Sequence, residues 1–513
     1  MHLAILKHET YQLLAANLPL STQIAIYAVV LVLAWCLSAR LRSVRQRQVL
    51  LLAVSYVLYA TWGVWFLAVL VSSSLMNYGL GHYLRKNPST RRLWLAVVLN
   101  ILLLSIFKYL PLGARLSGIS MLGGLGRLVL PIGMSFWTFE ALSYLLDLYR
   151  EEDLDPTLLE FCLYMAFWPT ALSGPICRLP QMLPQFRKYW TPLWDDLADG
   201  VQRMGVGLFM MWLSQILAAG LYPKTGVDSA FSAPVHSLGG VDVWCMIVGY
   251  GFQLFFNFCG YSHLVIGAAR LFGFRLAENF DRPYLSTTPS EFWTRWHMSL
   301  SFWIRDYVFF PLATRRPEMW WRNLSLVIAM FVFGLWHKGS ILFMIWGIYH
   351  GLLLAGHRYW QQSKIGVRLP TFLLEPVSWL VTFGGISVGW IFFRAESIHN
   401  AAAMLRDAFL PARFLRRGLP KTFYVLVLVM AAGYFVAVGV GKLLDRWGAT
   451  EGGFDWSSSL ARTGSTRVMT GVRLLALHRW VWLVPTLAVV TLYLYILLQP
   501  QVEAGAPMLY RIF

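Results

Sequence analysis

The chain alternates between long apolar stretches and short polar ones. A transmembrane helix needs about 20 apolar residues, and the apolar runs here lack the alternation typical of barrel strands. We therefore predict an all-α polytopic membrane protein with about 11 spanning helices, the shorter runs forming re-entrant helices. The apolar runs lie near 23–38, 49–62, 64–82, 93–111, 128–147, 157–174, 204–222, 240–272, 323–336, 340–357, 371–393, 422–441 and 480–498.

Composition supports this class. Hydrophobic residues make up 57% of the chain and charged residues 13%, with a mean hydropathy of +0.55, whereas soluble proteins have about 25% charged residues. The first apolar run lacks the features of a cleavable signal peptide. The five cysteines are scattered, so the sequence supports neither a metal site nor a disulfide framework.

The net charge of +18 is interpreted as a topology signal, because Lys and Arg cluster in loops beside apolar runs. The basic stretches 40–47 and 85–92 are expected on the cytoplasmic side with two helices between them, which puts the N-terminus outside. The stretches 315–322, 413–417 and 442–473 are also expected on the cytoplasmic side. Nucleic-acid binding is not expected from charges in such positions.

Residues 279–351 hold the candidate chemistry, two histidines that each follow a tryptophan, Trp296-His297 and Trp336-His337. The segment Thr288-Pro289-Ser290-Glu291 has the pattern of a capping box with proline at the first helical position. On that helix Trp293 and His297 are expected to share one face, which Ser301 and Arg305 would continue. A polar break, residues 337–340, interrupts the apolar run that follows, and such breaks are tolerated where the backbone lines a cavity or packs on protein.

A neutral imidazole in a cavity of low dielectric is a competent general base, able to accept a proton from an alcohol that attacks a thioester. Arg295 or tryptophan indoles could stabilise the resulting oxyanion. The plainer alternative is that each histidine only hydrogen-bonds a neighbouring helix. Trp293 and Trp296 fit packing better than chemistry. Arg305 and Asp306 point about 100° apart on a helix, so each is expected to pair with another helix.

Several motifs together resemble the membrane-bound O-acyltransferase family, especially its bacterial alginate O-acetyltransferase branch. The motifs are Asn279-Phe280 with Arg282-Pro283-Tyr284, residues 292–301 (FWTRWHMSLS), Trp303-Ile304-Arg305-Asp306-Tyr307, Gly334-Leu335-Trp336-His337, Trp346-Gly347 with His350-Gly351, residues 130–150, residues 168–178 and Gly389-Trp390-Ile391-Phe392-Phe393-Arg394.

The resemblance implies helices arranged around a funnel or tunnel, with His337 as the catalytic histidine and His297 as the second histidine of the bacterial branch. It further implies an acyl group taken from a cytoplasmic thioester and passed outward to a glycopolymer, often through a periplasmic partner of the SGNH-hydrolase type. The sequence departs from the family pattern at Asn257, His263, Met210-Met211 and Lys338, which leaves the acceptor and the partner open.

We therefore expect a membrane O-acetyltransferase of a bacterial inner membrane, with acetyl-CoA as donor, no bound cofactor or metal, and an exported polysaccharide as acceptor. Two alternatives stay open: transfer from an acyl or D-alanyl carrier protein to teichoic acid or peptidoglycan, and a non-catalytic subunit of an export complex. The expected organisation is an N-terminal span with its basic loop over residues 1–48, a catalytic core over residues 49–400 and C-terminal helices with basic loops over residues 401–513. The expected residues around the substrates are Asn279, Tyr284, Trp293, Arg295, Trp296, Ser301, Arg305, Asp306 and Trp336 beside His297 and His337.

Overall fold

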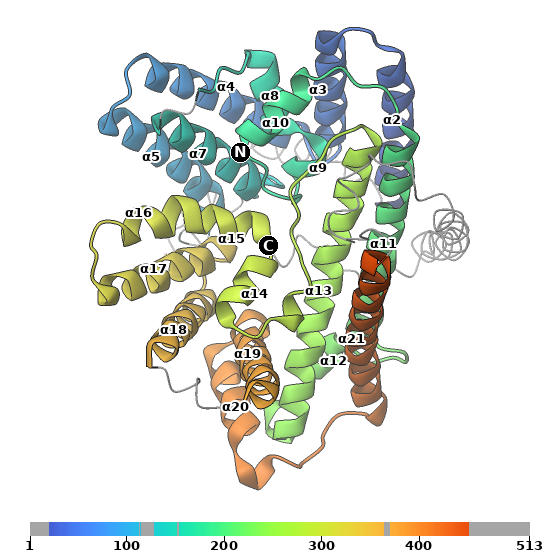
Figure 1. Cartoon of the computed structure of the whole chain (residues 1–513), viewed down its shortest axis with the longest axis vertical. Coiled ribbons are helices and arrows are strands. Elements are labelled where there is room, and N and C mark those ends of the chain that lie inside the picture. Colours follow the sequence, from blue (N-terminus) through green and yellow to red (C-terminus); the bar gives the residue numbers. More distant parts are fainter. Residues whose placement is uncertain (1–19, 112, 114–127, 151–152, 364–369, 451–513) are drawn as a thin grey trace, which may run out of the picture. The chain divides into compact units, whose positions relative to one another are not determined.

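The computed structural model describes residues 20–111, 113, 128–150, 153–363 and 370–450. These residues form helices joined by short loops (Figure 1), and among them the only β-type pairing is an isolated bridge between Phe280 and Trp296. Their contacts divide the chain into two units. The first holds the described residues up to Gly200 together with Val265–Glu278, and the second holds Val201–Leu264 and the described residues from Asn279 onward.

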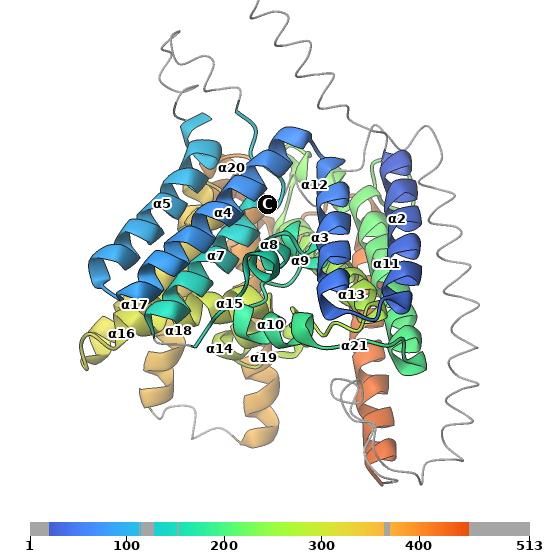
Figure 2. The same ribbon diagram turned by 90° about the horizontal axis from the view of Figure 1, so that it is seen from above.

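The first unit is built on antiparallel apolar helices, of which α4, α5 and α7 lie side by side (Figures 1 and 2). Asn77 of α4 and Asn100 of α5 exchange side-chain hydrogen bonds of 3.0 and 2.7 Å, so each buried amide is satisfied by the other. The helices are α2 Leu20–Arg40, α3 Val44–Ala60, α4 Val64–Lys86, α5 Thr90–Lys108, α7 Met134–Tyr149, α8 Leu158–Ala166, α9 Trp168–Ala171 and α10 Leu179–Arg187.

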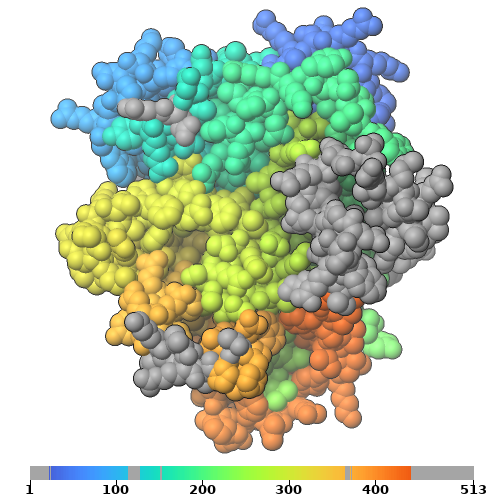
Figure 3. Space-filling view, viewed as in Figure 1, coloured from blue at the N-terminus to red at the C-terminus, as the bar shows by residue number. Residues whose placement is uncertain are grey.

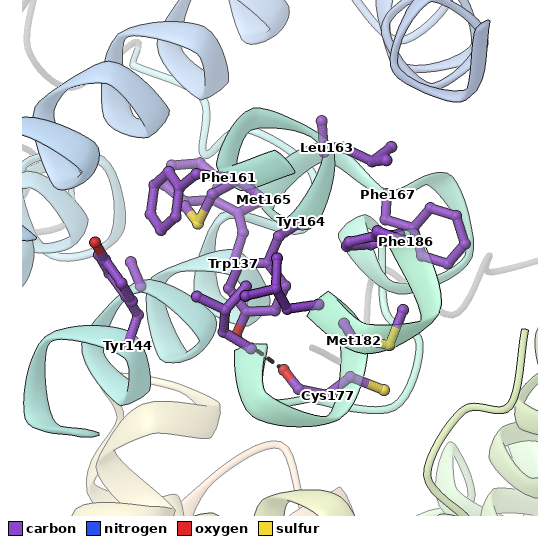
Figure 4. Close-up of a cluster of buried hydrophobic side chains, with 14 of the residues drawn as sticks. Trp137, Tyr144, Phe161, Leu163, Tyr164, Met165, Phe167, Cys177, Met182 and Phe186 are labelled. Atoms are coloured by element: carbon purple, nitrogen blue, oxygen red, sulfur yellow. Dashed lines mark hydrogen bonds between the residues drawn. The ribbon is translucent and has the colours of Figure 1, made fainter. Parts of the chain in front are cut away.

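Aromatic side chains fill the centre of this unit (Figure 4). The ring of Phe167 packs against Phe186 at 5.5 Å and against Phe274 at 4.9 Å between centroids. The Tyr164 hydroxyl donates a hydrogen bond of 3.0 Å to the Cys177 carbonyl, which satisfies a polar group inside the cluster. The apolar stretch near 157–174 does not form one span, because it is divided between the short helices α8 and α9.

Arg47 was expected in the basic loop of residues 40–47, but it lies in α3. Its side chain is buried and donates to the Phe272 carbonyl at 2.5 Å and to the Ser38 hydroxyl at 3.2 Å. The guanidinium also lies 4.8 Å from the ring centroids of Trp190 and Phe274. Arg47 thus connects α3 to residues 190 and 272–274, which are far away in sequence, through carbonyl and aromatic contacts.

The second unit contains the long helix α13 and a hairpin in which α17 packs along α18 (Figure 1). Several short helices carry the His297 segment, which follows α13 and precedes the hairpin in the chain. The elements are α11 Trp194–Ala219, which begins in the first unit, α12 Val227–Phe231, η3 Val235–Ser237, α13 Gly240–Leu271, which ends in the first unit, η4 Pro283–Leu285, α14 Pro289–Arg295, α15 Met298–Ile304, the π-helical turn η5 Arg305–Phe309, α16 Phe310–Ala313, α17 Met319–His337, α18 Ile341–Ser363, α19 Thr371–Arg394, α20 Ile398–Phe409, η7 Pro411–Arg413 and α21 Lys421–Thr450.

Six of the described helices are long and apolar enough to cross a membrane. The all-α membrane fold is therefore confirmed, while the expected count of about 11 spans stays a prediction. The apolar run 480–498 and the basic residues after 450 lie outside the described residues. The six helices are Val64–Lys86, Thr90–Lys108, Gly240–Leu271, Met319–His337, Phe372–Arg394 and Lys421–Val440.

Candidate active site

The segment that carries His297 is two short helices with a sharp break between them. Helix α14 begins as expected, with Pro289 at its first position and the Thr288 hydroxyl accepting from the Glu291 amide at 3.1 Å. The Glu291 carboxylate accepts from the backbone and the hydroxyl of Thr287, one residue before the expected partner. This helix ends at Arg295, and α15 begins only at Met298.

The expectation of one continuous helix that places Trp293 and His297 on a shared face is wrong. Trp296 is extended, and His297 has a left-handed backbone with φ of 42° and ψ of 53°. A non-glycine residue rarely adopts this region, so the surrounding structure must hold it there. The break separates the two side chains, since Trp293 contacts the rings of α17 and α18 and His297 packs against α13.

Residues 279–281 hold this break in place by running antiparallel to residues 295–298. The Asp281 amide donates to the Arg295 carbonyl at 3.0 Å, and the Met298 amide donates to the Asn279 carbonyl at 2.9 Å. The buried Asn279 side chain accepts from the Ser299 hydroxyl at 2.5 Å and donates to that of Ser262 at 3.1 Å. Asn279, expected near the substrate, is therefore buried and connects its own segment by hydrogen bonds to α13 and to the start of α15.

The imidazole of His297 is 1% exposed and meets the edge of Phe258 at 4.6 Å between centroids. Neither ring nitrogen has a hydrogen-bond partner among the described residues. Burial without a charged partner favours the neutral ring, and a buried polar group without a partner costs free energy.

His337 is the last residue of α17 and the first residue of the break that is predicted over residues 337–340. Its ring is 6% exposed and stacks on Phe333 at 5.1 Å with an interplanar angle of 16°. Further ring contacts close an aromatic cage around it. The cage is completed by Trp336 at 4.8 Å, Phe343 at 5.9 Å, Trp346 at 5.4 Å and Phe393 at 5.2 Å.

Glycines let α17 and α18 approach closely enough to form this cage. A Cβ added at Gly334 would lie closer than 3.0 Å to the Phe343 carbonyl oxygen, and one at Gly351 would lie 2.6 Å from the Cα of Val327. Backbone therefore touches backbone along the hairpin, as small residues allow at helix interfaces in membranes. The motif glycines thus allow the two helices of the hairpin to pack backbone against backbone.

A third histidine of the matched motifs, His350, also lies among these aromatic rings. His350 is fully buried, and its ring lies 4.9 Å from Trp346 and 5.2 Å from Trp293. Neither of its ring nitrogens has a hydrogen-bond partner among the residues described. The sequence carries one signal for this placement, since His350 follows Trp346 by four residues and therefore shares its helix face.

The imidazoles of His297 and His337 have different ring neighbours, but aromatic rings link them without a gap. His297 contacts Phe258, and His337 contacts Phe393. The intervening pairs have centroid distances between 5.1 and 5.7 Å. They are Phe258–Phe280, Phe280–Trp296, Trp296–Trp390 and Trp390–Phe393.

The remaining candidates have structural contacts. The Tyr284 hydroxyl donates to the Gly251 carbonyl at 2.7 Å, and the Ser301 hydroxyl donates to the Trp296 carbonyl at 2.9 Å. Arg295 pairs with Glu291 at 2.8 Å, four residues earlier on α14. The guanidinium charge at this segment is therefore already balanced by a carboxylate.

Arg305 and Asp306 pair with each other at 2.7 Å, contrary to the expectation. Residues 305–309 form a π-helical turn rather than a regular α-helix, and the exposed Arg305 side chain lies against the rings of Phe302 and Phe310. The expectation assumed the spacing of about 100° between neighbouring side chains of an α-helix. At a π-helical turn that spacing does not apply, and the long arginine side chain can fold toward the next residue.

These features define the class of protein. The family model described as membrane-bound O-acyltransferase matches residues 49–388, and the chain belongs to this family. It is an O-acyltransferase with a multi-pass membrane fold.

The chain is also similar to individual proteins of three kinds. The chain is 35% identical to the probable alginate O-acetylase of Pseudomonas aeruginosa over 378 residues, 71% of this chain and 70% of that one. It is 30% identical to the peptidoglycan O-acetyltransferase of Helicobacter pylori over 399 residues, 69% of this chain and 72% of that one. It is 33% identical to the teichoic acid D-alanyltransferase of Streptococcus thermophilus over 245 residues, 45% of this chain and 58% of that one.

Proposed function

We propose that this protein transfers an acetyl group from a cytoplasmic thioester, acetyl-CoA, toward hydroxyl groups of an exported, alginate-like polysaccharide. The observation that carries the proposal is His337, caged by aromatic rings at the end of a candidate spanning helix in a chain of this family. The broad similarity to alginate O-acetylases, over about 70% of both chains, supports acetyl as the group and a polysaccharide as the acceptor.

In this mechanism the His337 imidazole accepts the proton of the acceptor hydroxyl while the oxygen attacks the thioester carbonyl carbon. The carbon–sulfur bond then breaks, and the proton passes to the departing thiolate, so a free thiol and an O-acyl ester result. General base catalysis of this kind contributes about 10²–10⁴-fold in rate. The cage excludes water, which protects the thioester from hydrolysis.

His297 is assigned a supporting role. Its two buried ring nitrogens, without partners among the described residues, suit a hydroxyl or carbonyl oxygen of a bound substrate. Because both imidazoles are buried, substrates need a route through side-chain movement. The proposed entry is the loop after His337, where Lys338 is exposed and Gly339 and Ser340 are half-buried.

The acetyl group reaches the polymer either directly or through a periplasmic SGNH-type partner, in a bacterial inner membrane with the N-terminus outside. Transfer of a D-alanyl group from a carrier protein is the rival reaction. The narrower similarity to D-alanyltransferases, 45% of this chain, favours it less. A non-catalytic export subunit would not need either histidine.

The test uses purified protein in nanodiscs with radiolabelled acetyl-CoA, and in parallel with a D-alanyl carrier protein, each with a polysaccharide acceptor. His337→Ala should lower transfer from acetyl-CoA by at least about 100-fold, and His297→Ala should lower it less. His399→Ala is the matched control, because His399 is exposed on α20. Undiminished transfer by a folded His337→Ala variant contradicts the mechanism, and transfer from the carrier protein alone contradicts the donor.

A further inference from the structure

The segment from α20 to the start of α21 lies where three candidate spanning helices begin or end. Helix α19 ends at Arg394, α13 begins at Gly240 and α21 begins at Lys421. In Figures 1 and 3, α20 and the loop after it lie at the lower end of the view, beside the start of α13, with side chains on the visible surface. A segment that connects the ends of spanning helices is expected at the level of the polar headgroups.

A buried carboxylate holds this loop in one conformation. Asp242, fully buried, accepts hydrogen bonds from the backbone amides of Gly239 at 2.8 Å and Gly418 at 2.9 Å, and from the Tyr424 hydroxyl. The Val241 amide donates to the Phe414 carbonyl at 3.0 Å. These hydrogen bonds fix the backbone of the loop 410–418 to the first turn of α13.

Three arginines on this loop, Arg413, Arg416 and Arg417, form no ion pair with any described residue. The nearby carboxylates are occupied: Asp407 pairs with Arg406 at 2.8 Å, and Asp242 is buried under the loop. The described contact of the Arg416 guanidinium is a hydrogen bond to the His236 carbonyl at 3.4 Å. The loop therefore carries three positive charges that no described carboxylate neutralises.

Large, exposed apolar side chains flank these arginines in the sequence. Leu415 is 79% exposed, Phe409 is 60% exposed and Leu410 is 36% exposed. Apolar groups beside cations are typical of segments that lie in the membrane interface, where apolar side chains enter the acyl region and cations meet phosphates. A soluble anion would account for the arginines and leave Leu415 unexplained.

We propose that residues 409–417, here called the basic loop, bind the phosphate headgroups of anionic phospholipids, with Leu415 inserted among the acyl chains. Arg413, Arg416 and Arg417 supply the charge, and Asp242 supplies the fixed backbone. This inference does not depend on the proposed reaction, because lipid binding is measured without acyl transfer.

The test measures binding of phosphatidylglycerol to the full-length protein in detergent by native mass spectrometry, with phosphatidylcholine as reference lipid. Each arginine near an anionic surface is worth about a fivefold change in affinity. Replacing all three loop arginines with glutamine should weaken phosphatidylglycerol binding by at least about tenfold. This loss is smaller than the product of three fivefold effects, because the contributions of neighbouring charges are not fully additive. A matched variant removes the same charge from another basic stretch, through Arg315→Gln, Arg316→Gln and Arg322→Gln.

Three outcomes decide the proposal. A selective loss in the basic-loop variant, together with a loss in Leu415→Ser, supports it. Equal losses in both triple variants would mean that net charge alone attracts the lipid, and would overturn it. Unchanged lipid binding in Leu415→Ser, with coenzyme A displacing phosphatidylglycerol, would assign the arginines to a soluble phosphate ligand and would also overturn it.

Discussion

Replacing Gly351 with alanine tests whether backbone contact between α17 and α18 shapes the cage around His337. The new Cβ would lie 2.6 Å from the Cα of Val327, whereas ordinary contacts begin at 3.4 Å. Because the obstructing atom belongs to the backbone, no rotamer change can relieve the clash. The two helices must therefore separate by about 0.8 Å, which moves the cage residues on both sides of the hairpin.

Two opposing effects set the change in the free energy of unfolding of Gly351→Ala. Alanine in a helix interior is favoured over glycine by about 1 kcal/mol, while overpacking a tight contact costs about 1–3 kcal/mol. Gly356, on the same helix, has nothing within 4 Å of the corresponding Cβ, so Gly356→Ala keeps the gain without the cost. The two variants should therefore differ by about 1–3 kcal/mol in the free energy of unfolding.

Thermal unfolding in detergent, followed by tryptophan fluorescence, gives the comparison, and acetyl transfer measured at a temperature where both variants are folded gives the functional consequence. We expect Gly356→Ala to unfold at or above the wild-type temperature with full activity. Gly351→Ala should unfold lower and transfer more slowly. Equal unfolding temperatures and equal rates for the two variants would refute the idea that close helix contact maintains the cage.

Two further predictions concern carboxylates away from the cage. Burial by itself would raise the pKa of Glu160, but hydrogen bonds from Arg187 and Thr157 outweigh it and lower the pKa to about 2. The Glu160–Arg187 pair should therefore stabilise the fold above about pH 4.5 and lose its effect as the pH falls toward 2. Unfolding temperatures of wild type and Glu160→Gln should differ at pH 7 and converge on acidification; a constant difference would contradict this. Asp242→Asn should speed hydrogen–deuterium exchange at Gly418 while leaving α18 protected; unchanged exchange at Gly418 would show that this carboxylate does not hold the basic loop.

Local patterns were sufficient to predict several features of this protein. The apolar runs and low charge predict the all-α membrane class, which is confirmed. Proline at the first position of α14 predicts where this helix begins, and the polar residues after His337 predict where α17 ends. These signals succeed because helix ends and membrane burial depend on neighbouring residues in the chain. The roles of His297 and His337 in catalysis stay predictions.

The break at His297 was not predictable from local pattern, because helical spacing fits the sequence on both sides of it. Pairing of residues 279–281 with 295–298 holds the left-handed turn, and the bridged residues Phe280 and Trp296 are 16 residues apart (296 − 280). Arg47 was likewise assigned to a loop, since its partners Trp190 and Phe274 lie far away in sequence. The sequence alone thus determined which stretches are apolar helices and which residues can act as a base. Tertiary structure decided the direction of each imidazole and the rings that enclose it, because hydrogen bonds and ring packing between distant segments outweigh local helical preference.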